Sequence, residues 1–187
     1  YLRYYFACKL GDGIEDMDLN LDDFVARVNA DLVGKVVNIG SRCAGFIVKG
    51  HEGKLAERLP DPDLYARFTN AAAEIAGCYE RREFGRAMRE IMGLADLANQ
   101  YIDEKKPWIL AREAENAGDV QAICTQGLNC FRALMVFLKP VLPSMVERAE
   151  GFLDNGSLTW DDVAHPLLGV RINRFEPSVS YTHLRAH

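Results

Sequence analysis

Apolar residues recur every three or four positions along most of this chain, and no other sequence feature restricts the fold as strongly. The first such stretch extends from about residue 21 to 48, with apolar side chains at Phe24, Val28, Leu32, Val36 and Ile39. This spacing places them on one face of an α-helix. The body of the sequence contains no credible alternating pattern of a β-strand. We therefore predict an all-α fold.

Local signals within the first stretch predict how this helix begins and where it is interrupted. Asn20 is predicted to cap its first turn. Gly34, Gly40 and Gly45 lie inside it. Each glycine costs a helix roughly 1 kcal/mol relative to alanine, because its backbone loses more conformational freedom. We expect close packing or a local bend at these positions.

Four further helices are predicted from the same periodicity. Asp61 is the expected cap of the second, and the third extends from about residue 82 to 104, before Pro107. Asp119 is the expected cap of the fourth, and residues 144–147, Ser-Met-Val-Glu, predict a capping box for a shorter fifth. Five helices with short connections predict a bundle in which sequential neighbours run antiparallel.

Length and charge exclude several classes of function. The chain has 187 residues, enough for one sizeable core, and a formal net charge of −5 at pH 7. Because a net acidic surface does not capture polyanions by bulk charge, any nucleic-acid contact has to be local. The longest apolar runs are far shorter than a bilayer-spanning helix. We expect binding neither to DNA nor to a membrane.

No catalytic or metal-binding motif is recognisable in the chain. Its five cysteines form no C-x-x-C pair, and their odd number favours reduced thiols in a cytoplasmic protein. The run from Asp16 imitates the opening of a calcium-binding loop, but Leu21 replaces the turn glycine and Arg27 replaces the chelating glutamate. No nucleophile motif or phosphate-binding loop is present. We predict no catalytic residue, metal or cofactor in this segment.

A polar line interrupts the apolar pattern of the first helix. Lys35, Asn38 and Arg42 are spaced so that they share one helix face beside the apolar stripe. Such a face is cationic and can donate hydrogen bonds. An ordinary solvated helix surface has the same spacing, and that alternative stays open at this point.

A tryptophan directly after a proline marks the end of the third helix. Trp108 follows Pro107, and the positive charges of Lys105, Lys106 and Arg112 flank it. An exposed ring in this position is able to stack on an unpaired base, while Asn and Arg side chains read base edges by hydrogen bonds. The alternative is an indole that plugs the end of the bundle.

Longer runs of sequence point to one family. The matching residues are 23–32, Asn38, Ser41-Arg42, 86–92, 94–101, Pro107-Trp108 and 138–143. In these residues the chain resembles the anticodon-binding helical domain of bacterial methionyl-tRNA synthetases, which are class I aminoacyl-tRNA synthetases. The likeness extends over about residues 1 to 175.

The resemblance implies a set of binding residues and a division of the chain. It implies that Trp108 stacks on the anticodon, that Asn38 and Arg42 lie on the helix that reads its bases, and that Pro107 shapes the platform. Residues 1–19 would be the end of a connective region whose aromatic residues dock on the first helix. Residues 20–175 would be the anticodon-binding bundle, and 176–187 an atypical tail that is a candidate for non-native sequence.

The family's His-Ile-Gly-His and Lys-Met-Ser-Lys-Ser types of catalytic signature are absent from the sequence. The resemblance therefore implies a missing N-terminal catalytic domain, and a fragment that is inactive alone. Methionine tRNA would be the partner, and the parent ligase would use ATP and magnesium in the cytoplasm. Two alternatives stay open: a helical protein-interaction module, and the anticodon domain of a related class I synthetase.

Overall fold

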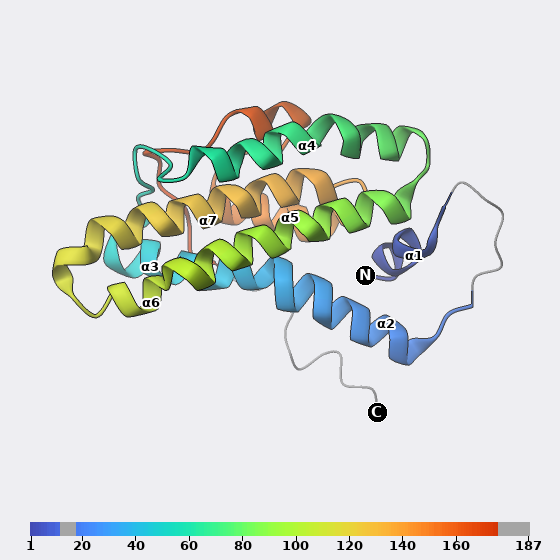
Figure 1. The fold of residues 1–187 in the computed structure, drawn as a ribbon, viewed down its shortest axis with the longest axis horizontal. Helices are drawn as coiled ribbons and strands as arrows, with labels where there is room; N and C mark the ends of the chain where they lie inside the picture. The colour runs from blue at the N-terminus through green and yellow to red at the C-terminus, as the bar shows by residue number, and fades with distance from the viewer. Residues whose placement is uncertain (12–17, 176–187) are drawn as a thin grey trace.

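The apolar stripes meet in the interior of a bundle of long helices (Figure 1). The computed structural model describes residues 1–11 and 18–175. Within these ranges the secondary structure is helical, apart from an isolated antiparallel bridge between Lys54 and Arg171. The α-helices of seven or more residues are α1 (Leu2–Lys9), α2 (Leu21–Arg27), α3 (Asn38–Gly50), α4 (Pro62–Glu80), α5 (Phe84–Lys105), α7 (Ala117–Leu138) and α8 (Pro143–Leu153). The predicted all-α bundle is confirmed.

The first predicted helix is one continuous rod that contains a π-helical segment. This segment, η1 (Val28–Val37), joins α2 to α3. Val28 and Val37 are both buried, although nine residues make two and a half turns of an α-helix and would place them on opposite faces. The wider π-helical turn, with bonds from i to i+5, brings both to the core side. Of the three glycines at which close packing or a bend was expected, only Gly34 lies in this segment. Gly40 is closely packed, since an added Cβ would lie 2.9 Å from the Phe175 ring, whereas at Gly45 it would meet nothing within 4 Å.

Helix starts agree only in part with the predicted caps. The Asp61 carboxylate accepts a hydrogen bond from the Leu64 amide at 2.9 Å, as predicted for the start of α4. Asp119 is not a cap, because α7 begins two residues earlier and places it in the first turn. The predicted capping box at residues 144–147 is also wrong. Helix α8 begins instead at Pro143, which has no backbone N–H that needs a hydrogen-bond acceptor. No side chain caps this helix.

Helix α7 lies at the centre of the bundle and holds irregular chain segments with buried polar side chains. Its buried polar residues are Thr125, Gln126, Asn129 and Arg132. The Asn129 side chain accepts from the Leu167 amide at 2.6 Å and donates to the Leu167 carbonyl at 3.0 Å. Arg132 pairs with Asp162 at 2.7 Å. These bonds fix the chain after α8 along the bundle.

Helix α1 was not predicted, but its aromatic residues dock on the first rod as expected. The Tyr4 hydroxyl donates to Asp31 at 2.8 Å, and the Tyr5 ring meets Phe24 edge-on with ring centres 5.6 Å apart. The expected tail at residues 176–187 and the start of the calcium-like run at Asp16 lie outside the described residues. Among the helices that are described, none has the length and apolar content needed to cross a bilayer.

Candidate nucleic-acid interface

Trp108 lies just beyond the end of α5, in the short helix α6 (Pro107–Leu110). Helix α5 ends because Lys106 adopts a left-handed conformation, with φ of 48°, and proline follows. Pro107 is buried in the first turn of α6, whereas the Trp108 indole keeps 36% of its surface exposed. Trp108 is therefore not fully buried in the end of the bundle.

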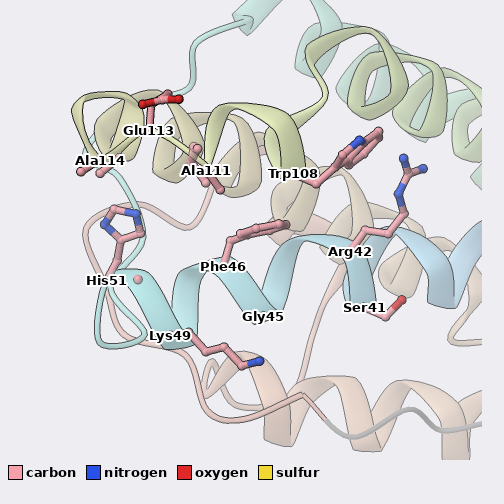
Figure 2. Close-up of a pocket in the computed structure, with 13 residues that line it drawn as sticks. Ser41, Arg42, Gly45, Phe46, Lys49, His51, Trp108, Ala111, Glu113 and Ala114 are labelled. Atoms are coloured by element: carbon pink, nitrogen blue, oxygen red, sulfur yellow. The ribbon is translucent and has the colours of Figure 1, made fainter.

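Arg42 from α3 lies over the Trp108 ring (Figure 2). Its guanidinium carbon is 4.5 Å from the ring centre, which is within the range of a cation–π contact. One Nη atom is 2.5 Å from a carboxylate oxygen of Asp103, on α5. Three elements thus hold Arg42 and Trp108 together. The structure places these two predicted residues next to each other, and Pro107 directly precedes Trp108 at the start of α6.

Three polar pairs join the first rod to α5, and we call them the polar ladder: Lys35–Asp96, Asn38–Asn99 and Arg42–Asp103. The two members of every pair are 61 positions apart, so the rods run in the same direction. Both cations face carboxylates. The spacing predicted a cationic face on the first helix. The structure corrects this prediction, because the carboxylates on α5 compensate the positive charges of that face.

Asn38 belongs to this ladder one turn before Arg42. Its amide donates to the side-chain oxygen of Asn99 at 3.3 Å. Asn99 in turn donates to the backbone carbonyls of Lys35 at 3.1 Å and Ala95 at 2.9 Å. Asn38 is therefore fixed in orientation and half-buried. Its side-chain oxygen accepts no hydrogen bond from any described residue.

Sequence reasoning missed the α5 side of the ladder. Asp96, Asn99 and Asp103 repeat the spacing of Lys35, Asn38 and Arg42 on the other rod. That shared spacing, together with complementary charge, is a signal that could have paired the two lines before the structure was known.

A pocket of about 640 Å³, which we call the Trp108 pocket, opens beside this pair. Figure 2 shows that it extends from Trp108 and Arg42 along α3 to His51. Phe46 lies in it, between Trp108 and His51. Small residues such as Gly45, Ala111 and Ala114 line it elsewhere. The pocket is mostly apolar, and its polar lining residues are Ser41, Arg42, Lys49, His51 and Glu113.

Exposed positive charge lies on the pocket wall and close to Trp108 in the chain. Lys49 lines it, and Lys106 and Arg112 flank Trp108 in the chain. Within the described part of the chain, none of these three side chains has an ion pair or hydrogen bond. They are local cations on a chain whose net charge is negative.

The thiols beneath the site are unreactive. Cys43 and Cys130 are completely buried. A hydrogen bond with Cys124, together with burial, raises the pKa of Cys43, and burial raises the pKa of Cys130 to about 12. Both thiols are therefore protonated at neutral pH and are poor nucleophiles. The described residues also contain no group of three or more His, Cys, Asp or Glu side chains that could hold a metal ion.

Two family models cover the parts of the chain that build this site. The model of the anticodon binding domain of methionyl tRNA ligase matches residues 51–173, which is more than half of the chain. The chain therefore belongs to this family. The model of class I tRNA synthetases of the methionine type matches residues 1–44. Asn38 and Arg42 lie in the second match and Trp108 in the first, so both parts of the methionyl-tRNA ligase pattern contribute to the site.

Solved structures of methionyl-tRNA synthetase from Mycobacterium tuberculosis share this fold. The apo form aligns with a TM-score of 0.80 and 17% identity, over 95% of this chain and 37% of that chain. The form in complex with methionyl-adenylate aligns with a TM-score of 0.68 and 20% identity, over 81% of this chain and 30% of that chain. This chain thus spans about a third of the length of those synthetases.

Proposed function

We propose that this methionyl-tRNA ligase domain binds the anticodon loop of methionine tRNA, with an unstacked base resting on Trp108. One observation carries the proposal: an exposed indole is held against Arg42 at the mouth of a pocket of about 640 Å³. Single-stranded RNA loops are recognised by aromatic stacking and by hydrogen bonds to base edges, and this arrangement supplies both.

The four predicted residues have different roles in this proposal. Trp108 provides the stacking surface, which is worth about 1 to 3 kcal/mol per base. Arg42 provides a forked donor for base edges, and Asn38 provides an amide one turn away. Pro107 fixes the backbone that presents the indole. The polar ladder keeps Arg42 and Asn38 in place before RNA binds, so little side-chain entropy is lost on binding.

The domain acts, in our proposal, as the selecting part of a larger cytoplasmic ligase. Residues 20–175 form the anticodon-binding bundle, and residues 1–19 connect it to a catalytic domain outside this chain. That domain would use ATP and magnesium to activate methionine and then transfer it to the tRNA. Binding free energy gained at the anticodon holds the acceptor end at the distant catalytic site. This chain alone would not charge tRNA.

The test is the binding of anticodon stem-loops to the wild-type chain and to Trp108→Ala. A fluorescent stem-loop with a CAU anticodon is titrated in an anisotropy assay against loops with altered anticodons. The wild type should prefer CAU, and Trp108→Ala should weaken CAU binding by about 1 to 3 kcal/mol, because one stacking surface is lost. The melting temperature should change little, since the indole is partly exposed.

Leu21→Ala is a suitable control, because Leu21 is also exposed but lies at the start of the first rod. Its affinity for the CAU loop should equal that of the wild type. Equal affinity of Trp108→Ala and the wild type would reject the stacking role. Binding of amphipathic helical peptides, with no binding of any stem-loop, would favour a protein-interaction module instead.

A further inference from the structure

Residues 170–175, which we call the strap, are hydrogen-bonded at two points before they reach α3. In the loop after α3, the Leu55 amide donates to a carbonyl of the strap at 2.9 Å. Further along, the Asn173 amide donates to the Phe152 carbonyl near the end of α8, at 2.8 Å. Phe175 follows two residues later. Its backbone position is therefore fixed by bonds to the chain on both sides of the strap.

The Phe175 ring packs against α3 at Gly40. A Cβ added at Gly40 would lie 2.9 Å from this ring and 3.3 Å from Phe131, so the ring needs a glycine at that position. Phe152 and Phe131 meet the Phe175 ring edge-on, with ring centres 4.9 and 6.1 Å away. The cavity beside it is only about 10 Å³, roughly the space of one water molecule. The ring therefore fills a site at the junction of α3, α7 and α8.

Gly40 lies on the opposite side of α3 from the residues that, in our proposal, read the anticodon. It is two positions from Asn38 and two from Arg42, which is about 200° around an α-helix. Asn38 and Arg42 both bond to side chains of α5. Helix α3 is thus held between the polar ladder on one side and the Phe175 ring on the other.

We infer that Phe175 is a positioning residue for anticodon reading, because its ring holds α3 where Asn38 and Arg42 meet their partners. The inference rests on the proposed function, since it requires those two residues to contact RNA. The bond most sensitive to the position of α3 is that from Asn38 to Asn99, which at 3.3 Å is already long. A small movement of α3 away from α5 breaks this bond and separates Arg42 from the Trp108 ring.

The first test compares Phe175→Ala with Phe84→Ala. Phe84 is also half-buried and meets Tyr79 edge-on at 6.1 Å, but it lies at the start of α5, about 28 Å along that helix from Asp103. Each variant loses one aromatic ring from the edge of the core, so the melting temperatures should fall by similar amounts. Anisotropy titrations, made below both melting temperatures, measure affinity for a CAU stem-loop and for loops with altered anticodons.

The ratio of these affinities separates positioning from stability. Partial unfolding removes competent protein and lowers both affinities equally, whereas a displaced α3 lowers the preference for CAU. Phe175→Ala should reduce this preference about three- to tenfold, and Phe84→Ala should leave it unchanged. Phe175→Leu retains most of the apolar volume and should recover most of the preference. An equal loss of preference in Phe84→Ala would overturn the inference.

A substitution on α3 tests the same contact without removing the ring. The methyl group of Gly40→Ala cannot share the site with the Phe175 ring, so this variant should also reduce the CAU preference. Gly93→Ala is the control, because Gly93 is an exposed helical glycine whose added Cβ meets nothing within 4 Å. The double variant Gly40→Ala, Phe175→Ala should lose no more than Phe175→Ala alone. Losses that add would show that Phe175 does not act through Gly40.

Failure of the proposed function and failure of this inference give different results. If the wild type does not prefer the CAU loop, the proposed function fails, and this inference fails with it. If the wild type prefers CAU and both Phe175→Ala and Gly40→Ala retain that preference, only the role of Phe175 is rejected. If Phe175→Ala does not fold, Gly40→Ala measured against Gly93→Ala decides the question with the same expected direction.

Discussion

At the scale of single residues, Arg42 is restrained by two neighbours of different kind. The Asp103 carboxylate holds one end of the guanidinium at 2.5 Å, and the Trp108 ring at 4.5 Å sets its plane. Exposed ion pairs contribute only about 0 to 1 kcal/mol to stability, so we attribute to this pair an orienting role rather than a stabilising one. An arginine has five N–H donors, and Asp103 engages one Nη atom of Arg42, whose side chain is 22% exposed.

Arg42→Gln should therefore reduce both affinity and selectivity. We expect a loss of about 1.5 to 3 kcal/mol for a CAU stem-loop, because hydrogen bonds from a charged donor are lost, and a smaller difference between CAU and altered anticodons. Arg42→Lys keeps the charge without the fork, so it should recover affinity more than selectivity. If Arg42→Gln still discriminates between anticodons as well as the wild type does, Arg42 is not a reader.

Asp162 gives stability a pH dependence that can be measured. It accepts hydrogen bonds from the Thr159 amide at 2.6 Å and pairs with the buried Arg132. Although burial alone would raise the pKa of Asp162, the Thr159 hydrogen bonds and Arg132 lower it overall. A lowered pKa in the folded state means that this stabilisation is complete above the ordinary aspartate pKa of about 3.9. It is lost as the pH falls through the lower folded value.

Asp162→Asn should thus be less stable than the wild type at neutral pH, and the gap should shrink below about pH 4. Urea denaturation at a series of pH values measures the gap. The neighbouring Asp161→Asn is the control, because Asp161 is exposed and its side chain has no partner among the described residues. A gap of the same size at pH 3 and pH 7 would contradict this account of Asp162.

At the scale of elements, the π-helical segment η1 aligns the two halves of the first rod. Its wider turn keeps Val28 and Val37 on the core side, and α3 then begins with Asn38 facing Asn99 on α5. Space is tight at Gly34 in this segment, because a Cβ added there would lie 3.2 Å from the Asn29 carbonyl oxygen. The π-helical geometry therefore gives a structural reason for glycine at position 34, and there is no such reason at position 45.

Alanine substitutions at the two glycines should consequently differ. Gly45→Ala should raise the free energy of unfolding by about 0.5 to 1 kcal/mol, because a helical glycine in open space becomes alanine. Gly34→Ala should gain less or become destabilising, since the carbonyl of Asn29 has to move. Chemical denaturation of both variants makes the comparison. An equal gain at both positions would show that η1 imposes no local restriction.

At the scale of the whole molecule, net charge and local charge have opposite signs around the site. The chain carries a formal charge of −5, whereas Lys49 lines the Trp108 pocket and the exposed Lys106 and Arg112 lie near Trp108 in the chain. An acidic protein with a small basic patch does not hold RNA by bulk attraction. In our proposal, stacking and hydrogen bonding supply the selectivity, and a few phosphate contacts add affinity.

The salt dependence of stem-loop binding should accordingly be shallow. About three phosphate contacts predict a slope near −2 in a plot of log K against log salt, since each contact on a single strand contributes about −0.7. Lys106→Ala should reduce the steepness by about one such step, and anisotropy titrations across a salt series measure it. A slope several times steeper would indicate that electrostatic attraction dominates, against this prediction.

The predictions that succeeded depend on local chemistry. Asp61 and Pro107 mark helix ends through hydrogen bonds and φ restrictions that neighbouring residues fix, and the structure confirms the cap at Asp61. The prediction that Asp119 caps a helix was wrong because an acidic residue is favourable both as a cap and in the first turn, where it interacts with the helix dipole. The two cases differ only in the position of the residue. Helix α1 has only a weak helical pattern in its sequence. Its position is set by tertiary contacts such as the hydrogen bond from Tyr4 to Asp31.

The sequence by itself determined the helical class and the approximate extent of the long helices, because periodicity and turn chemistry act over a few neighbouring positions. Spacing and the family resemblance together proposed the residues of the candidate site. Only the tertiary structure decided that Arg42 lies on Trp108, that the polar ladder neutralises its own cations, and that a pocket extends beyond the indole. Those features depend on how two distant helices align side by side. Side-chain packing across the whole core sets that alignment.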